Sequence, residues 1–290
     1  YGSQEAMAHI GMVFCDPDNV ILVPNPGYPL FEMSGIMAGA NVEYYEIREE
    51  NGYLPDLKNI PGEVLERTKY MVVSYPLNTV CVCAPDHFYE ELIAFAKEHH
   101  IVIIHDNAYS DIIFTREQGR SFLSFDGAKE VGVEFYSLSK SYNLTGARIS
   151  FVVGNKAIVE KFKTLRSQID YGIFLPIQKA AIAALTGPDD FIEKQRQEYA
   201  KRNCALCGGL RRIGWNVPDS QGTMFVWAKI PKGYASSFDF CMQLVEKTGL
   251  LVTPGSAFGS AGEGYIRMAL VVDLPVIGEI LEVLEKSGMF

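Results

Sequence analysis

The chain has 290 residues, of which 48% are hydrophobic and 21% are charged, as is typical of a globular protein with about two domains. Its formal net charge of -9 argues against a general binder of nucleic acid or acidic membranes, because clustered positive charge recognises those partners. No apolar run approaches the roughly 18 residues of a membrane span and no secretory signal is present, so we expect a cytoplasmic protein with small-molecule partners.

The first half of the chain alternates short β-branched and apolar runs with helical patterns, which favours an α/β fold with helices on the faces of a mostly parallel central sheet. The runs are almost continuously hydrophobic, so we expect strands that are buried on both faces. Residues 86–99 follow Pro85 and carry an apolar stripe, which indicates a crossover helix. The predicted strands are Val20–Val23, Tyr70–Ser74, Ile101–His105, Glu134–Tyr136 and Ile149–Val153.

The second half of the chain changes character. Residues 156–214 are helical in pattern, and the charged segment 188–212 is long enough to connect two domains. Strand patterns follow at 223–230, 250–254 and 265–270, with helices near 237–247 and 275–286. We therefore expect a large domain at 1–186, and an interdomain helix with a smaller α+β C-terminal domain at 187–290.

Polar residues follow the predicted strands at the sheet edge where open α/β sheets bind ligands. Asp106 comes directly after one strand, and Tyr109 lies three positions later. Asn78 comes from the end of a neighbouring strand. An isolated Asp at such an edge is more often a helix cap, but these three side chains could surround one ring.

Two isolated cations follow the next predicted strand. Lys140 lies between serines, and Arg148 comes eight residues later in an otherwise uncharged interior. A lysine between serines is most often simply exposed, yet this one lies at the same sheet edge as Asp106. A buried guanidinium needs an anion, and phosphate matches its donor geometry.

The segment S-L-S-K-S-Y-N-L-T-G-A-R-I at 137–149 resembles the lysine-attachment motif of class I/II aminotransferases, which are pyridoxal phosphate enzymes of fold type I. The resemblance covers essentially the whole chain. The lysine motif and residues 165–185 are most similar to LL-diaminopimelate aminotransferase-like members. The other landmarks, in the family's order, are GSQE at 2–5, NPGYP at 25–29, YPLN at 75–78, HDNAY at 105–109 and the arginine of YIRMAL at 265–270.

The resemblance implies a role for each residue. Lys140 would bind the aldehyde of pyridoxal 5'-phosphate covalently and then move a proton, while Asp106 would pair with the ring nitrogen. Tyr109 would act with Asn78 on the ring hydroxyl oxygen. The remaining contacts would be a stacking Tyr28, a phosphate site made by the amides of Ser3 and Gln4 with Ser137, Ser139 and Arg148, and a substrate carboxylate site made by Arg267 with Asn78.

The implied activity is a ping-pong transfer of an amino group from an amino acid to a 2-oxo acid, of the LL-diaminopimelate or the aspartate/alanine type. The family also implies a homodimer with its active site near the interface. Two alternatives remain: a cystathionine-type C-S β-lyase on the same scaffold, which shares Lys140, Asp106 and Arg267, and a noncatalytic regulatory module. Loss of the lysine or the aspartate would mark such a module, and both are present.

The chain departs from the family pattern in three places. Thr79 stands where the family usually has proline, so we expect a trans peptide or a shifted Asn78. Ser150 replaces a glycine or alanine. The family's N-terminal arm, first helix and first strand have no counterpart before Tyr1, so we expect that a preceding segment is missing.

Other motifs predict no further chemistry. The glycine-rich stretch at 259–264 lacks the context of a dinucleotide site, and no P-loop occurs. The six cysteines are too few for a disulfide framework, and Cys204 and Cys207, in a predicted helix, are expected to pack in the core. The histidines have no metal-ligand spacing, so no metal is expected. His105 is expected either to modulate Asp106 or to pack at the sheet edge.

Overall fold

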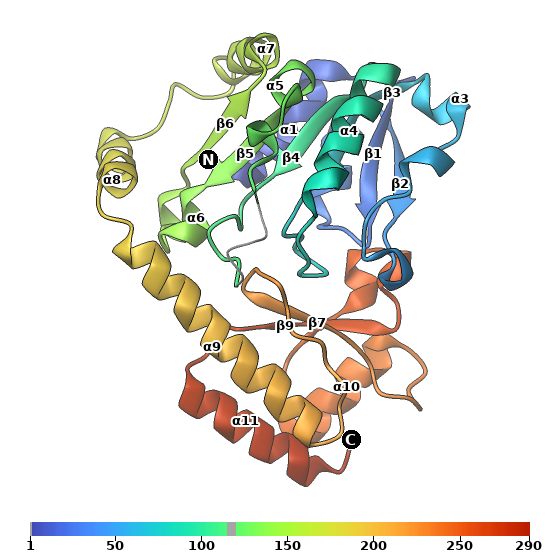
Figure 1. Ribbon diagram of the computed structural model, residues 1–290, viewed down its shortest axis with the longest axis vertical. Helices are drawn as coiled ribbons and strands as arrows, with labels where there is room; N and C mark the ends of the chain where they lie inside the picture. Colours follow the sequence, from blue (N-terminus) through green and yellow to red (C-terminus); the bar gives the residue numbers. More distant parts are fainter. Residues whose placement is uncertain (1, 115–119) are drawn as a thin grey trace.

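The computed structural model describes residues 2–114 and 120–290, which form a six-stranded and a three-stranded sheet (Figure 1). The six strands lie in the order β2-β1-β3-β4-β5-β6. All neighbouring pairs in this sheet are parallel except β5 and β6. The strands are β1 (Val20–Asn25), β2 (Asn41–Glu46), β3 (Thr68–Val73), β4 (Val102–Asp106), β5 (Gly132–Ser137) and β6 (Ser150–Gly154).

Helices cover both faces of the large sheet, as the predicted α/β class requires (Figure 1). The 13-residue α1 lies behind the sheet and α4 lies in front of it. Helix α4 begins directly after Pro85, as predicted. The helices of this part are α1 (Gly2–Phe14), α2 (Leu30–Ala38), α3 (Gly62–Leu65), α4 (Asp86–His99), α5 (Ala128–Val131), α6 (Leu138–Ser141) and α7 (Lys156–Arg166).

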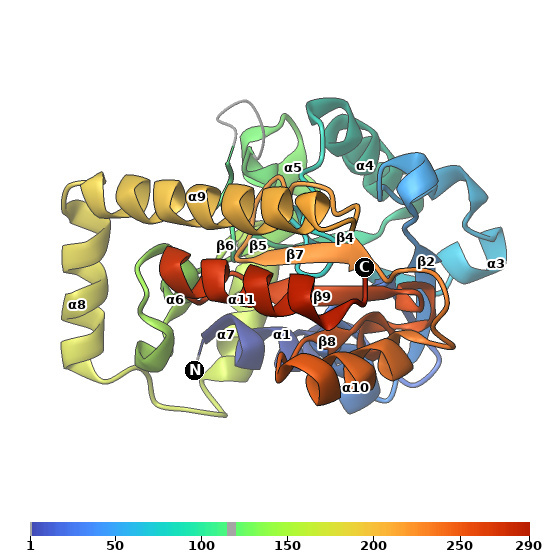
Figure 2. The ribbon, with the colours of Figure 1, turned by 90° about the horizontal axis from the view of Figure 1, so that it is seen from below.

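The rest of the chain builds the antiparallel sheet β7-β9-β8 and its helices. Helix α9 leaves the level of the large sheet and then runs beside α11 along the small sheet (Figures 1 and 2). The elements are α8 (Leu175–Thr186), α9 (Asp190–Arg212), β7 (Phe225–Lys229), α10 (Ser237–Thr248), β8 (Thr253–Pro254), β9 (Tyr265–Ala269) and α11 (Leu274–Ser287).

The buried apolar side chains form two principal clusters. The first contains Ile21, Tyr70 and Ile103 of the large sheet with residues of the helices that cover it. The second contains Leu210 from α9 with Phe240 and residues of the small sheet. The long helix therefore reaches from one unit into the core of the other, while the domain limit at residue 187 stays a prediction.

The structure corrects three expectations about strands. Strand β2 was missed because it is a largely exposed edge strand with acidic residues rather than an apolar run. Strand β6 is not buried on both faces, since it is the other edge strand and most of its residues are partly exposed. Only Thr253 and Pro254 of the predicted strand 250–254 pair with a neighbour.

Among the residues that the structure describes, no helix is both long and apolar enough to cross a membrane.

Candidate active site

A polar pocket lies where the parallel strands of the large sheet end. Strands β4 and β5 end at Asp106 and Ser137, and the short α6 then carries Lys140. Because β6 returns antiparallel to β5, Arg148 comes back to the same edge. The lining residues include all those predicted to touch the cofactor: Ser3, Gln4, Tyr28, Asn78, Asp106, Tyr109, Ser137, Ser139, Lys140 and Arg148, with Met7, Leu30, Phe31 and Ala108 beside them.

Asp106 presents a buried acceptor in this pocket. Its Oδ1 atom is buried and finds no hydrogen-bond partner within residues 2–114 and 120–290. Burial raises the pKa of Asp106 to about 6, although the charge of His105 and the backbone N-H of Ala108 act in the opposite direction. An unsatisfied buried acceptor is unfavourable, so this carboxylate suits a ligand that donates a proton, such as a protonated ring nitrogen.

Lys140 is half-buried on α6, whose first residues are fixed by a cap. The Ser137 hydroxyl accepts a hydrogen bond of 3.2 Å from the backbone N-H of Ser139. Burial lowers the pKa of Lys140, and the positive charges of Arg148 and Arg267 lower it further. A lysine with a lowered pKa is more readily neutral, which is the state that can attack an aldehyde carbon.

Arg148 lies against Gly2 at the start of α1. Gly2 has a φ of +80°, and a Cβ atom there would lie 2.6 Å from Nη2 of Arg148. The first amides of a helix have no partner inside the helix, and those of Ser3 and Gln4 are at this position in α1. Guanidinium, amides and serine hydroxyls therefore line one part of the pocket, a donor set that suits phosphate.

Arg267 adjoins the pocket from the small sheet. It is on β9, and its Nη1 donates a hydrogen bond of 2.6 Å to Oδ1 of Asn78. Its guanidinium carbon lies 4.0 Å from the ring centroid of Phe225 and 4.5 Å from that of Phe258. Burial lowers the pKa of Arg267. This stacked guanidinium is oriented at the rim by two aromatic rings, which suits recognition of a planar carboxylate.

Asn78 and Tyr109 complete the wall between the two sheets. The bond between Asn78 and Thr79 is trans, since the cis peptides in the described chain are Asn25–Pro26 and Tyr75–Pro76. Replacement of proline by Thr79 thus leaves Asn78 in the pocket. Tyr109 is 6% exposed and packs edge-on against Phe225. Burial raises the pKa of Tyr109, so its hydroxyl stays protonated at neutral pH.

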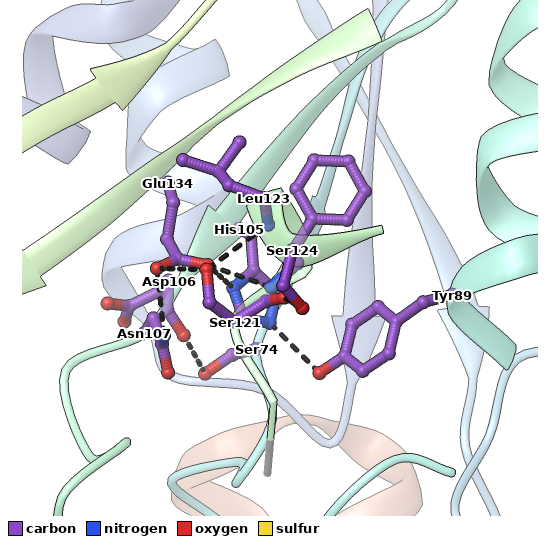
Figure 3. Close-up of polar contacts among 10 residues, drawn as sticks. Ser74, Tyr89, His105, Asp106, Asn107, Ser121, Leu123, Ser124 and Glu134 are labelled. Atoms are coloured by element: carbon purple, nitrogen blue, oxygen red, sulfur yellow. Dashed lines mark hydrogen bonds and ion pairs between the residues drawn. The ribbon is translucent and has the colours of Figure 1, made fainter. Parts of the chain in front are cut away.

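The residues that sequence reasoning missed lie behind the pocket. Glu134 on β5 forms a buried polar cluster with His105, Asn107 and Ser121 (Figure 3). His105 belongs to this cluster and packs at the sheet edge, one of its two expected roles. The signal was an acidic residue within a strand that was predicted to be buried on both faces.

A second missed residue comes from the long helix. Gln195 on α9 donates a hydrogen bond from its side chain to the backbone carbonyl of Lys140. The other amide atom, Oε1, is buried without a partner in the described part of the chain. No local pattern distinguishes this glutamine from the exposed polar residues of the same helix, so only the structure reveals it.

The described residues contain no group of three or more histidine, cysteine and acidic side chains that could hold a metal ion. Cys207 is buried and packs in the second core as expected, whereas Cys204 is exposed. The expectation of core packing for Cys204 was therefore wrong.

Known proteins are similar to this one over nearly the whole chain. The profile of a family described as "Aminotransferase class I and II" matches residues 1–284. Two curated proteins named LL-diaminopimelate aminotransferase are similar. That of Halothermothrix orenii is 45% identical over 288 residues, 99% of this chain and 74% of that protein. That of Moorella thermoacetica is 39% identical, covering 98% and 73%.

Solved structures agree in fold. Substrate-bound BacF from Bacillus subtilis superimposes with a TM-score of 0.96 at 36% identity, covering 99% of this chain and 73% of that one. A Staphylococcus aureus aminotransferase gives a TM-score of 0.95 at 30% identity, covering 100% and 77%. The large and small units described above are thus matched together, as one arrangement.

Proposed function

Because the chain belongs to the class I and II aminotransferase family and is an aminotransferase, we propose that it exchanges an amino group between an amino acid and a 2-oxo acid by a ping-pong mechanism at the pocket described above. The family uses pyridoxal 5'-phosphate. The observation that carries the proposal is the convergence of Lys140, Asp106 and Arg148 on one pocket with a buried, unsatisfied carboxylate oxygen.

Different pocket residues would hold different parts of the cofactor. Asp106 would hold the ring nitrogen protonated, and Arg148 with the amides at the start of α1 would hold the phosphate. Asn78 accepts from Arg267 through Oδ1, so its amide nitrogen would donate to the ring oxygen, together with the Tyr109 hydroxyl. Tyr28 would cover a ring face. When bound, the cofactor supplies an electron-withdrawing ring that lowers the energy of negative charge at the substrate Cα.

Lys140 would bind the cofactor and then serve as the base that moves the Cα proton. Its lowered pKa keeps the free amine available for both tasks. Arg267 would hold the α-carboxylate of the amino acid as a bidentate pair, with Phe225 and Phe258 fixing the plane of the guanidinium. The substrate would then be fixed between the two sheets.

The substrate that we propose is LL-diaminopimelate with a 2-oxo acid as amino acceptor. The support is the printed name of curated relatives that are 39% and 45% identical over nearly the whole chain. Aspartate or alanine remains the alternative amino donor.

We also propose that the protein acts as a homodimer. The support is a group of exposed apolar side chains around α8, among them Tyr171, Phe174 and Ile182. They adjoin a cavity of about 590 Å³ that reaches Gly2 at the start of α1. Light scattering on the purified protein tests the proposal, since a monomer at micromolar concentration would contradict it.

Covalent labelling tests the central proposal. The protein is loaded with pyridoxal phosphate, reduced with borohydride and digested, and the modified peptide is identified by mass spectrometry. We expect the label on Lys140 and its complete loss in Lys140→Ala. The exposed Lys156 provides the matched control, because Lys156→Ala should retain full labelling of Lys140. Label on another lysine in the native protein would refute the assignment.

The reaction itself is tested by half-reactions. Each candidate amino acid is mixed with the loaded protein, and conversion of the cofactor to its amine form is followed by absorbance. We expect LL-diaminopimelate to convert it fastest. Release of pyruvate from cystathionine without such conversion would instead select the β-lyase alternative.

A further inference from the structure

A buried carboxylate lies on β5 behind the pocket, on the far side of the strand that ends in Asp106. Glu134 is 5% exposed. It accepts hydrogen bonds of 2.9 Å from the Asn107 amide, 2.9 Å from the Ser121 hydroxyl and 3.0 Å from the backbone N-H of Phe122, and it lies 3.2 Å from Nδ1 of His105 (Figure 3). Burial opposes ionisation, but these hydrogen bonds and the charge of His105 hold the pKa of Glu134 below its usual value.

Two side-chain partners of Glu134 are the chain neighbours of Asp106: His105 on β4, and Asn107 directly after it. Successive side chains of a strand point to opposite faces, so His105 and Asn107 turn to Glu134 while Asp106 turns to the pocket. The backbone is fixed at the same place: the N-H of Asn107 donates to Phe135, and the Ser74 hydroxyl donates 2.9 Å to the carbonyl of Asp106. Glu134 therefore contacts both the residue before and the residue after Asp106, whose carboxylate lines the pocket.

Stability alone does not account for a charge at this place. Taking a carboxylate out of water is unfavourable until its partners offset the loss, and apolar replacements of buried ion pairs are often neutral or stabilising. The two neighbours of Glu134 on β5, Val133 and Phe135, are apolar and fully buried. A well-satisfied polar cluster at this one point instead restricts the chain to a single arrangement.

We propose that Glu134 is a positioning residue that holds Asp106 in register with the ring nitrogen of the cofactor, through His105 and Asn107. The inference rests on the proposed function of the pocket. Glu134 itself does not line the pocket. The titratable groups that face the cluster are His105, Asp106 across the strand, and Tyr89 of α4, whose hydroxyl lies 3.4 Å from Nε2 of His105.

The test compares Glu134→Gln with Glu130→Gln. Both remove one carboxylate, but Glu130 is an exposed residue of α5 that pairs with Lys97. The measurements are the dissociation constant of pyridoxal phosphate by equilibrium dialysis, the pH midpoint of its visible absorption when bound, and the Tm of the cofactor-free protein. We expect roughly tenfold weaker cofactor binding and a displaced pH midpoint in Glu134→Gln, and native values in Glu130→Gln.

The possible outcomes distinguish a role of Glu134 in positioning Asp106 from a role in protein stability alone. A lowered Tm with native cofactor affinity and a native pH midpoint would overturn the proposal, since Glu134 would then be structural only. If Glu134→Gln does not fold, Asn107→Ser carries the test, because it keeps the pairing of Glu134 with His105 and releases one side of Asp106. Native affinity in that variant would overturn the proposal too.

The result is distinguishable from failure of the proposed function. If the function is wrong, the native protein itself shows no label on Lys140. If only this inference is wrong, the native protein is labelled and the variants bind the cofactor as tightly as it does.

Discussion

The buried carboxylate of Asp106 destabilises the cofactor-free protein, because its Oδ1 atom has no hydrogen-bond donor among the described residues. Burial raises its pKa from 3.8 to about 6. Below about pH 4 the group is protonated in the folded and the unfolded chain, so burial then carries no charge penalty. Above about pH 6 it is ionised in both, and the folded chain alone bears the cost of the buried charge.

Asp106→Asn should therefore stabilise the cofactor-free protein at neutral pH. We expect a gain of up to roughly 3 kcal/mol above about pH 6, which disappears below about pH 4. Urea unfolding of both proteins across this pH range measures the difference. Exposed Asp126 is the matched control, since Asp126→Asn should show no comparable pH-dependent gain. An advantage that does not vary with pH would contradict the explanation.

The same variant should lose cofactor affinity, because a neutral amide no longer favours a proton on the ring nitrogen. The position would then resemble other functional sites in which a group that is unfavourable for the free protein is retained for ligand binding.

Most pocket residues could be predicted at this scale because each sits in a short, distinctive run. Lys140 and Arg148 share one such segment, and Asp106 and Tyr109 share another. Glu134 could not be predicted in the same way. Its partners Ser121 and His105 lie 13 and 29 residues away in the sequence, so its role depends on strand pairing.

At the scale of elements, the position of α1 depends on a close approach to α2. A Cβ atom at Gly11 would lie 2.0 Å from the backbone oxygen of Ser34 and 3.1 Å from the Tyr70 hydroxyl. Neither group can move freely. Ser34 is inside α2, and its hydroxyl forms a hydrogen bond of 2.7 Å with the Tyr70 hydroxyl. The start of α1, with the amides that line the pocket, is thereby set at a fixed distance from the sheet.

Gly11→Ala should destabilise the protein by about 1–3 kcal/mol through overpacking and should weaken phosphate binding at the start of α1. Gly278 provides the contrast, because it is an exposed interior residue of α11 with no atom within 4 Å of its Cβ position. Gly278→Ala should instead stabilise by about 0.5–1 kcal/mol. Thermal unfolding of both variants measures these changes in stability. Equal changes of the same sign would refute the packing argument.

Helix α4, which has strong periodicity, was predictable, whereas the edge strand β2 was not. Helix α4 has both its apolar stripe and its preceding proline, and its predicted limits are those of the structure. Strand β2 has neither signal, because only Tyr45 of its six residues is buried. It becomes a strand through hydrogen bonds to β1, which no local pattern reports.

At the scale of the whole molecule, the pocket joins two units through Arg267. Its hydrogen bond to Asn78 spans 189 positions of the sequence and connects the small sheet with the wall of the large one. Enzyme class and fold could be predicted from the ordered motifs, but this contact could not, since it depends on how the two sheets are packed together.

Arg267→Lys should impair substrate binding and leave cofactor binding unchanged. Lysine cannot make the bidentate contact with a carboxylate, so we expect KM for the amino acid to rise about 10- to 100-fold. Stopped-flow half-reactions and cofactor dialysis provide the two measurements. Arg202→Lys is the control, because Arg202 pairs with Asp273 away from the pocket. Equal loss of cofactor affinity in Arg267→Lys would contradict a role confined to the substrate.

The antiparallel return of β6 alongside β5 has a mechanical consequence. Lys140 and Arg148 both belong to the connection between these two paired strands, so both are anchored to the large sheet. Arg267 belongs to the other sheet. A hinge motion between the sheets would change the distance from Arg267 to Lys140 and leave that from Lys140 to Arg148 unaltered. Such a motion would open the proposed site for exchange of an amino acid and an oxo acid, while the residues proposed to hold the cofactor keep their spacing.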